Sequence, residues 1–191
     1  MNRRIEPTYR WLRSVLQLLQ WQDERHDPPR PWLLKSPIHL GRLDEIFSVF
    51  PDATIVHCHR DLLDAIPSHA ALVESMREVY SDRVDSHEAG RYTMAISAQG
   101  LRDHAAARPR WLVAGKTFED IDYAEIVSDI ERVVKRIYAR IPLPFTAATQ
   151  SALRQWVAAN PRHRHGDFTY DLEHFGLSAE EIREKLSFPI R

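Results

Sequence analysis

Residues 31–68 read PWLLKSPIHLGRLDEIFSVFPDATIVHCHRDLLDAIPS. Two short apolar runs in this stretch, 32–34 and 53–57, suit buried strands. Each run is followed by a polar turn and then by a segment whose apolar residues recur at helical spacing. Strands that alternate with helices predict a parallel sheet, and ligands bind such sheets at the carboxyl ends of the strands. The two turns are therefore the first places to look for a functional site.

The rest of the chain continues the alternation of helix and strand. Ser36 followed by proline predicts a capped helix that runs to Phe50. The other predicted elements are helices at 8–26, 62–80, 87–106 and 146–159, a strand at 118–123 with apolar helix positions from Ile126 to Ile137 behind it, and a helix that begins at the Ser178–Glu181 capping box. We expect one α/β domain over residues 1–191, with a mostly parallel sheet covered by helices on both faces.

The composition excludes several functional classes. The chain has 191 residues, a formal net charge of -1 and a single cysteine. This charge gives no bulk attraction to nucleic acid, and no apolar run is long enough to cross a membrane. The N-terminus lacks the apolar stretch of a signal peptide, so we expect a cytoplasmic protein. Cys58 lies in an apolar strand pattern that predicts a buried, inert thiol, and the five tryptophans lie in patterns that predict core packing.

The first turn carries Lys35, Ser36 and His39. Lys35 follows an apolar run and precedes a predicted helix N-terminus, where free N–H groups and partial positive charge favour an anion. His39 falls in the first predicted helical turn and is near enough to share a pocket with the lysine. The pair suits stabilisation of a leaving oxyanion and removal of a proton from a hydroxyl. A solvated lysine and a surface or capping histidine remain the alternative interpretation.

The second turn carries Arg60, with Ser68 eight residues later. The planar fork of an arginine suits a phosphate, which it binds through two parallel hydrogen bonds. Ser68 would lie about two helical turns further on, facing the same ligand. The alternative is an ordinary surface ion pair between Arg60 and Asp61 or Asp64.

Taken together, the two turns resemble the sulfotransferase family, whose members use 3'-phosphoadenosine 5'-phosphosulfate (PAPS). The phrase W-x-L-K-S-P-x-H-L of a bacterial branch stands at Trp32–Leu40, and the phrase T-x-V-x-x-H-R-D stands at Thr54–Asp61. The resemblance implies a P-loop-NTPase-like parallel sheet. It also implies that Arg60 and Ser68 bind the 3'-phosphate of the donor.

The same resemblance assigns the catalytic residues. It places Lys35 at the oxygen that bridges phosphate and sulfur. Many members have a histidine base two residues after that lysine, but here that position is Pro37. His39, four residues after the lysine, is therefore the expected base.

Two further phrases extend the resemblance along the chain. Members carry Y-E-D-L-x-x-D-P, and here Tyr123 and Asp129 match while Ile130 replaces the proline. The resemblance places Tyr123 against the adenine. The tail that begins at Arg162 is similar too, and Arg162 and Arg164 would reach the 3'-phosphate, a solvated loop being the alternative.

We predict no metal ion. The three histidines that suggest one, His163, His165 and His174, lack the spacing of a metal motif.

One part of the family pattern is missing from these residues. Members begin with a strand and a loop of the type G-x-P-R-S/T-G-T-[ST], which wraps the 5'-phosphosulfate. No two of the six glycines here are close enough to build that loop. Gly115-Lys116-Thr117 ends like a phosphate loop, but Arg110 stands where its first glycine is required. We therefore expect the N-terminal strand-loop-helix unit to be absent and the chain to be the C-terminal portion of a truncated sulfotransferase.

The predicted activity is transfer of a sulfuryl group from PAPS to the hydroxyl of a small-molecule acceptor, impaired or lost in this shortened form. One alternative is a non-catalytic fragment that binds adenosine 3',5'-bisphosphate weakly. The other is a small-molecule kinase on a related scaffold, which requires a phosphate loop and a magnesium ligand that the sequence does not offer.

Overall fold

The computed structural model describes residues 5–23, 31–161 and 171–190, and these fall into two compact units. The first comprises the chain up to Ala53 together with Gly100–Lys116. The second comprises Thr54–Gln99 and Thr117–Pro189. The long helix α4 (Ser86–Val113) therefore contributes residues to both units.

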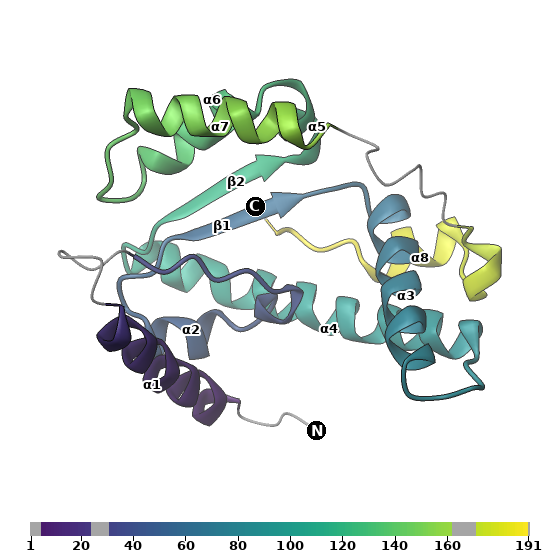
Figure 1. Cartoon of the computed structure of the whole chain (residues 1–191). Helices are drawn as coiled ribbons and strands as arrows, with labels where there is room; N and C mark the ends of the chain where they lie inside the picture. Colours follow the sequence, from purple (N-terminus) through teal and green to yellow (C-terminus); the bar gives the residue numbers. More distant parts are fainter. Residues whose placement is uncertain (1–4, 24–30, 162–170, 191) are drawn as a thin grey trace. The chain divides into compact units, whose positions relative to one another are not determined.

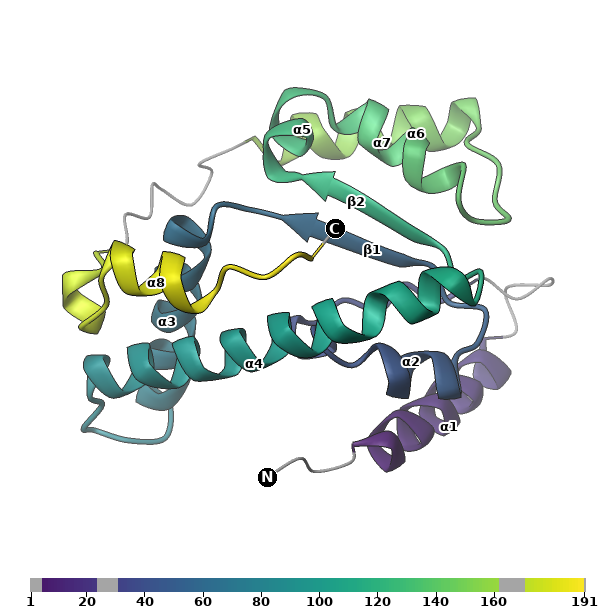
Figure 2. The ribbon, with the colours of Figure 1, turned by 180° about the vertical axis from the view of Figure 1, so that it is seen from behind.

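The first unit is built on two packed helices, α1 (Glu6–Gln22) and α2 (Leu43–Val49), seen in Figure 2. Tyr9 and Leu16 of α1 are buried, because a spacing of seven residues places them on one face. Four of the seven α2 residues are buried. The predicted N-terminal helix is confirmed, with its first residue at Glu6.

The prediction of one long helix from the Ser36 cap to Phe50 is wrong in its first half, because an α-helix forms only from Leu43. Ser36 caps only a short 3-10 turn, η1 (Pro37–His39), and its hydroxyl oxygen accepts a hydrogen bond from the Ile38 amide at 3.3 Å. The cap itself is therefore confirmed, but the turn is too short to carry a helix dipole.

Gly41 explains why this helix is interrupted. Its φ of 75° is left-handed, which takes the chain out of the helical region before α2 begins. A Cβ on Gly41 would lie 2.7 Å from the carbonyl oxygen of Gly100. Only a glycine lets the turn approach α4 this closely, so a tertiary contact decides the break.

The strand predicted at 32–34 does not form in the described residues. Trp32, Leu33 and Leu34 are 48%, 90% and 37% exposed, and none of them belongs to a sheet. A strand needs a partner for its backbone groups. None of the strands described here pairs with this segment, so its apolar sequence alone is insufficient.

The second unit contains a two-stranded parallel sheet of β1 (Ile55–His59) and β2 (Phe118–Asp122), which lie side by side in Figure 1. The parallel pairing agrees with the predicted parallel sheet, although β1 begins and ends two residues later than the predicted strand at 53–57. Directly paired residues point to the same face of a sheet. One face therefore carries Val56, Cys58, Glu119 and Ile121, and the other carries His57, His59, Asp120 and Asp122.

Helices α5 (Tyr123–Ser128), α6 (Ile130–Tyr138) and α7 (Ala147–Ala159) follow β2, and α5 and α6 contact it. The single helix expected behind the third strand is divided at Asp129, whose carboxylate accepts a hydrogen bond from the Arg132 amide at 2.9 Å. The side chain at this position competes with the backbone and starts a new helix. Glu119 and Ile121 are buried on the face of β2 that α6 covers.

The remaining helices of this unit are α3 (Leu62–Glu78) and α8 (Ala179–Lys185), which contact each other, and the short turn η2 (Glu173–Phe175). The predicted capping box is confirmed in its first half, since the Ser178 hydroxyl accepts from the Glu181 amide at 3.2 Å. Leu177 and Ile182 are both buried beside it, as the staple requires.

Two predictions about burial are wrong. Cys58 is exposed, because β1 pairs on only one side within the described chain, and partial desolvation of the sulfur raises the pKa of its thiol. Four of the five tryptophans are also exposed: Trp11, Trp21, Trp32 and Trp156. None of the described helices combines the length and the apolar composition that a membrane span requires.

Candidate functional site

The second predicted turn connects β1 to α3. Asp61 caps α3, because its carboxylate accepts a hydrogen bond from the Leu63 amide at 2.9 Å. The cap fixes the start of the helix directly after Arg60. Ser68 lies in the same helix and is half-buried. The turn therefore ends a strand, as the sequence predicts, and continues into a helix of 17 residues.

Arg60 and Tyr123 meet at the carboxyl ends of the two strands. His59 pairs with Asp122 in the sheet, so the next residue of each chain segment emerges at the same edge. The guanidinium carbon of Arg60 lies 5.0 Å from the centre of the Tyr123 ring. This is cation–π distance, and it leaves the guanidinium next to an aromatic face. Two residues predicted for one ligand, 63 positions apart in the sequence, are thus brought together.

Arg60 also makes the contact expected of a surface arginine. Its Nε lies 3.7 Å from an Asp64 carboxylate oxygen, and both side chains are exposed. Such pairs contribute about 0–1 kcal/mol. The weak pair leaves most of the guanidinium hydrogen-bonding capacity for another partner.

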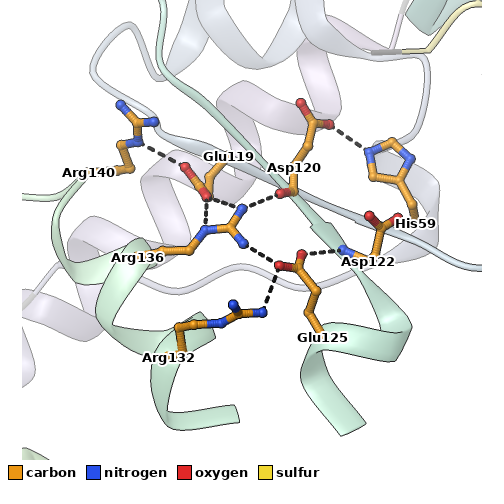
Figure 3. Close-up of polar contacts among 8 residues, drawn as sticks. All are labelled: His59, Glu119, Asp120, Asp122, Glu125, Arg132, Arg136 and Arg140. Atoms are coloured by element: carbon orange, nitrogen blue, oxygen red, sulfur yellow. Dashed lines mark hydrogen bonds and ion pairs between the residues drawn. The ribbon is translucent and has the colours of Figure 1, made fainter. Parts of the chain in front are cut away.

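Tyr123 is held in place by the start of α5. Asp122 and Glu125 form a capping box, in which the Glu125 carboxylate accepts a hydrogen bond from the Asp122 amide at 3.2 Å. Glu125 also accepts hydrogen bonds from Arg136 at 2.8 Å and Arg132 at 3.3 Å, as Figure 3 shows. The residue that follows β2 therefore has a defined backbone position rather than a free loop position.

A buried carboxylate of β2 anchors α6. Glu119 is 4% exposed, and its two oxygens accept hydrogen bonds from Arg136 and Arg140, each at 2.8 Å (Figure 3). Burial alone would raise the pKa of Glu119, but the hydrogen bonds from Arg140 and Arg136 outweigh it and lower the pKa. This clamp was not predicted from the sequence. The available signal was a pair of arginines four residues apart, of which Arg136 lies in α6 and Arg140 lies just beyond its end.

The residues of the first turn belong to the other unit. Lys35 is exposed, and His39 is half-buried in η1. The Nδ1 atom of His39 lies 2.8 Å from the Tyr9 hydroxyl, which joins η1 to α1. Burial lowers the pKa of His39, and burial together with the nearby Glu45 raises the pKa of Tyr9 to about 12. The histidine is therefore neutral and the phenol protonated near neutral pH.

Tyr9 is a candidate that sequence reasoning missed. No sequence pattern links it to His39, because 30 positions separate the two residues. Lys35 and His39 lie in the first unit, and Arg60, Ser68 and Tyr123 lie in the second.

The remaining predicted ligands have different outcomes. Arg162 and Arg164, as well as His163 and His165, lie outside the described residues. The Nε2 atom of His174 lies 3.2 Å from a Glu74 carboxylate oxygen, which is a contact between η2 and α3. A different group of side chains, of types that can bind a metal ion, comes together on the sheet: His57, His59 and Asp120.

Comparisons with known proteins give one consistent picture. A sequence profile of the sulfotransferase family matches residues 4–147. Omega-hydroxy-beta-dihydromenaquinone-9 sulfotransferase Stf3, from Mycobacterium bovis and Mycobacterium tuberculosis, is 24% identical over 180 residues that cover 91% of this chain and 44% of the relative. The alignment thus extends over nearly the whole chain.

Solved structures agree with the sequence comparison. The crystal structure of sulfotransferase STF9 from Mycobacterium avium matches with a TM-score of 0.82 at 28% identity, covering 100% of this chain and 48% of that one. Sulfotransferase STF1 from Mycobacterium tuberculosis matches with a TM-score of 0.67 at 27% identity, over 83% of this chain and 40% of the other. The chain spans less than half the length of each of these proteins.

Proposed function

This chain belongs to the sulfotransferase family, and we propose that its second unit binds the 3'-phosphate and the adenine of PAPS. The observation that carries the proposal is the position of Arg60 against the ring of Tyr123, at 5.0 Å. The family resemblance assigns Arg60 to the 3'-phosphate and Tyr123 to the adenine of the same nucleotide. A guanidinium suits a phosphate, and a tyrosine ring suits stacking with a base.

The residues at this edge fit an anionic nucleotide. The exposed pair between Arg60 and Asp64 is weak, whereas a bidentate hydrogen bond from arginine to phosphate is among the stronger polar contacts. Arg60 can therefore exchange its carboxylate partner for a phosphate at little cost. Ser68 adds a hydroxyl on the helix that follows the same turn.

For the intact enzyme we propose sulfuryl transfer to a hydroxyl group. The acceptor oxygen forms a bond to sulfur while the bond from sulfur to the bridging phosphate oxygen breaks, and adenosine 3',5'-bisphosphate leaves. His39 takes the acceptor proton, for which its neutral form is required, and the lowered pKa of His39 favours that form. Lys35 stabilises the charge that develops on the bridging oxygen. The roles of these two residues rest on the family resemblance.

The acceptor is proposed only as a small molecule with a hydroxyl group. The Stf3 relatives are named for an omega-hydroxy compound, which is consistent with that class. We also propose that β1 and β2 belong to a P-loop-NTPase-like parallel sheet. The 191 residues contain no glycine-rich loop for the 5'-phosphosulfate, so we expect them to bind the bisphosphate without turnover when tested alone.

Calorimetric titration tests the nucleotide site directly. The chain is titrated with adenosine 3',5'-bisphosphate and with adenosine 5'-monophosphate, which lacks the 3'-phosphate. We expect the bisphosphate to bind more tightly, and Arg60→Ala to weaken it by about 10- to 100-fold, the value of a charge-assisted hydrogen bond. The same variant should leave the monophosphate almost unchanged.

Arg91→Ala provides the matched control. Arg91 is an exposed arginine of the same unit, paired with Asp85 at 3.8 Å, and its removal should not affect either titration. Equal affinity for the two nucleotides in the wild-type chain would reject the 3'-phosphate site. Tighter binding of ATP than of the bisphosphate would favour the kinase alternative instead.

A further inference from the structure

We propose that His57, His59 and Asp120 form a binding site for a divalent transition-metal ion of the zinc class. Each residue offers one ligand atom, and these atoms all lie within 4.8 Å of one another. Sulfuryl transfer as proposed above has no step that involves a metal. The site is therefore a separate property of the β1–β2 sheet.

The sheet register explains why the three side chains converge. His57 and His59 are two residues apart on β1, so both project from the same face. Asp120 of β2 pairs directly with His57 and projects from that face too. The Nε2 atom of His59 lies 2.6 Å from the Asp120 carboxylate, and the centres of the two imidazole rings are 4.2 Å apart. Figure 3 shows the carboxylates of Asp120 and Glu119 directed to different partners, His59 and the arginines.

The proposed metal ligands are partly buried, which favours metal binding more than full exposure to water would. The His59 side chain is 8% exposed and that of Asp120 is 26% exposed. Asp122 pairs with His59 in the register, so a second carboxylate residue belongs to the same face. Two imidazoles and a carboxylate on rigid strands are therefore held in partial shelter from water.

The ligand types select the class of ion. Imidazole suits zinc, copper, iron and nickel, whereas magnesium and calcium prefer oxygen ligands alone. Three protein ligands with room for water are typical of zinc sites that are not purely structural. In a tetrahedral site the ligand atoms are separated by about 3.3 Å, given bonds of about 2.0–2.1 Å. The 2.6 Å contact between His59 and Asp120 would have to open slightly, which requires only side-chain rotation.

Cobalt(II) is the appropriate probe, because its absorption spectrum reports imidazole coordination and geometry. We expect saturable one-to-one binding to the purified chain, displacement by zinc(II), and no displacement by magnesium. The variants Asp120→Asn and His57→Ala should each weaken cobalt binding by more than about tenfold. Asp120→Asn preserves size and hydrogen-bonding capacity, so it separates metal binding from packing.

Two controls address the other histidines of the chain. The double variant His163→Ala/His165→Ala and the single variant His174→Ala must bind cobalt like the wild type. If the double variant abolishes binding while Asp120→Asn does not, the proposal is overturned. Circular dichroism at each titration point establishes that the variants are folded.

Thermal unfolding supplies a second readout that does not depend on the spectrum. A ligand that binds only the folded state raises Tm, so zinc should raise the Tm of the wild type and of both histidine controls. It should leave the Tm of Asp120→Asn unchanged. Absence of any zinc effect on the wild-type chain, together with absence of saturable cobalt binding, would also overturn the site.

Discussion

The hydrogen bond between Tyr9 and His39 determines which imidazole nitrogen remains available to a substrate. Nδ1 faces the Tyr9 hydroxyl at 2.8 Å, so only Nε2 can act on another molecule. For Nε2 to accept a proton, Nδ1 must carry the hydrogen of the neutral ring and donate it to the Tyr9 oxygen. Tyr9 is then a positioning residue, and the proposed base depends on it.

This assignment predicts the behaviour of His39 in the variant Tyr9→Phe. An oxygen that accepts a hydrogen bond from Nδ1–H favours the charged ring, so its removal should lower the pKa of His39 further. Nitrogen NMR should find the Nδ1–H tautomer in the wild type and a mixture of tautomers in the variant. A proton NMR titration of the same two proteins measures the pKa, with no need for catalytic turnover.

His69 serves as the internal reference for that experiment. Burial also lowers its pKa, and it lies in the other unit, so Tyr9→Phe should not change its titration. Observation of the Nε2–H tautomer for wild-type His39 would contradict the base assignment, because Nε2 would already carry a proton.

The candidate residues differ in how far the sequence could predict them. Arg60 follows a strand, and the rule that ligands bind at the carboxyl ends of strands was enough to select it. Tyr123 was selected only through the family resemblance, because the sequence pattern placed it within the strand. Tyr9 and Glu119 could not be selected, because their hydrogen-bond partners are distant in the sequence. The partner of Tyr9 lies 30 positions away, and the two partners of Glu119 lie 17 and 21 positions away. Nucleotide binding remains a prediction for all five of these residues: Arg60, Ser68, Tyr123, Arg162 and Arg164.

At the scale of elements, local sequence signals predicted where capped helices begin better than they predicted how far the helices continue. Ser178 and Ser36 cap as expected, because a cap involves neighbours within three residues. The break at Asp129 is local, because its carboxylate accepts a hydrogen bond from the Arg132 amide. The break at Gly41 and the missing strand at 32–34 depend on what lies nearby in space. The close approach of Gly41 to Gly100, and the lack of a strand partner for 32–34 in the described chain, are features of the tertiary structure.

Glu119 gives a prediction about how β2 is held to α6. Glu119→Gln removes the charge that Arg136 and Arg140 share, and it should lower the free energy of unfolding by about 1–3 kcal/mol at pH 7. Because folding lowers the pKa of this carboxyl, its stabilisation is fully present above the ordinary glutamate range. The stabilisation is lost as the pH falls through the pKa of the folded state. Urea unfolding of both proteins across this pH range measures the difference, which should shrink on acidification.

Glu181→Gln is the control for that series. Glu181 pairs with Lys185 on the surface of α8, where the Lys185 side chain is exposed and the Glu181 side chain is half-buried. Its replacement should change stability by less than about 1 kcal/mol. A pH-independent difference between wild type and Glu119→Gln would mean that packing, rather than charge, accounts for the loss.

At the scale of the whole molecule, the distribution of apolar surface was the least predictable property. α1 buries Tyr9 and Leu16 on one face, yet Trp11 and Leu18, also seven residues apart, are 68% and 52% exposed. A helix with apolar residues on opposite faces usually packs against other parts of a protein on both of these faces. Periodicity identifies such faces, but it does not say what covers them.

The exposed face of α1 predicts that the chain associates with itself near neutral pH. The formal net charge is -1 and the isoelectric point is about 6.8, so electrostatic repulsion between copies is weak. At about pH 5.5, below the isoelectric point, the chain carries net positive charge, and this charge should disperse the associated species. Sedimentation velocity over a range of protein concentrations measures the self-association. We expect Trp11→Gln to reduce it, and Trp156→Gln, on α7, to have a smaller effect. A monomer at all concentrations near neutral pH would contradict the prediction, and equal effects of the two substitutions would show that association is not specific to α1.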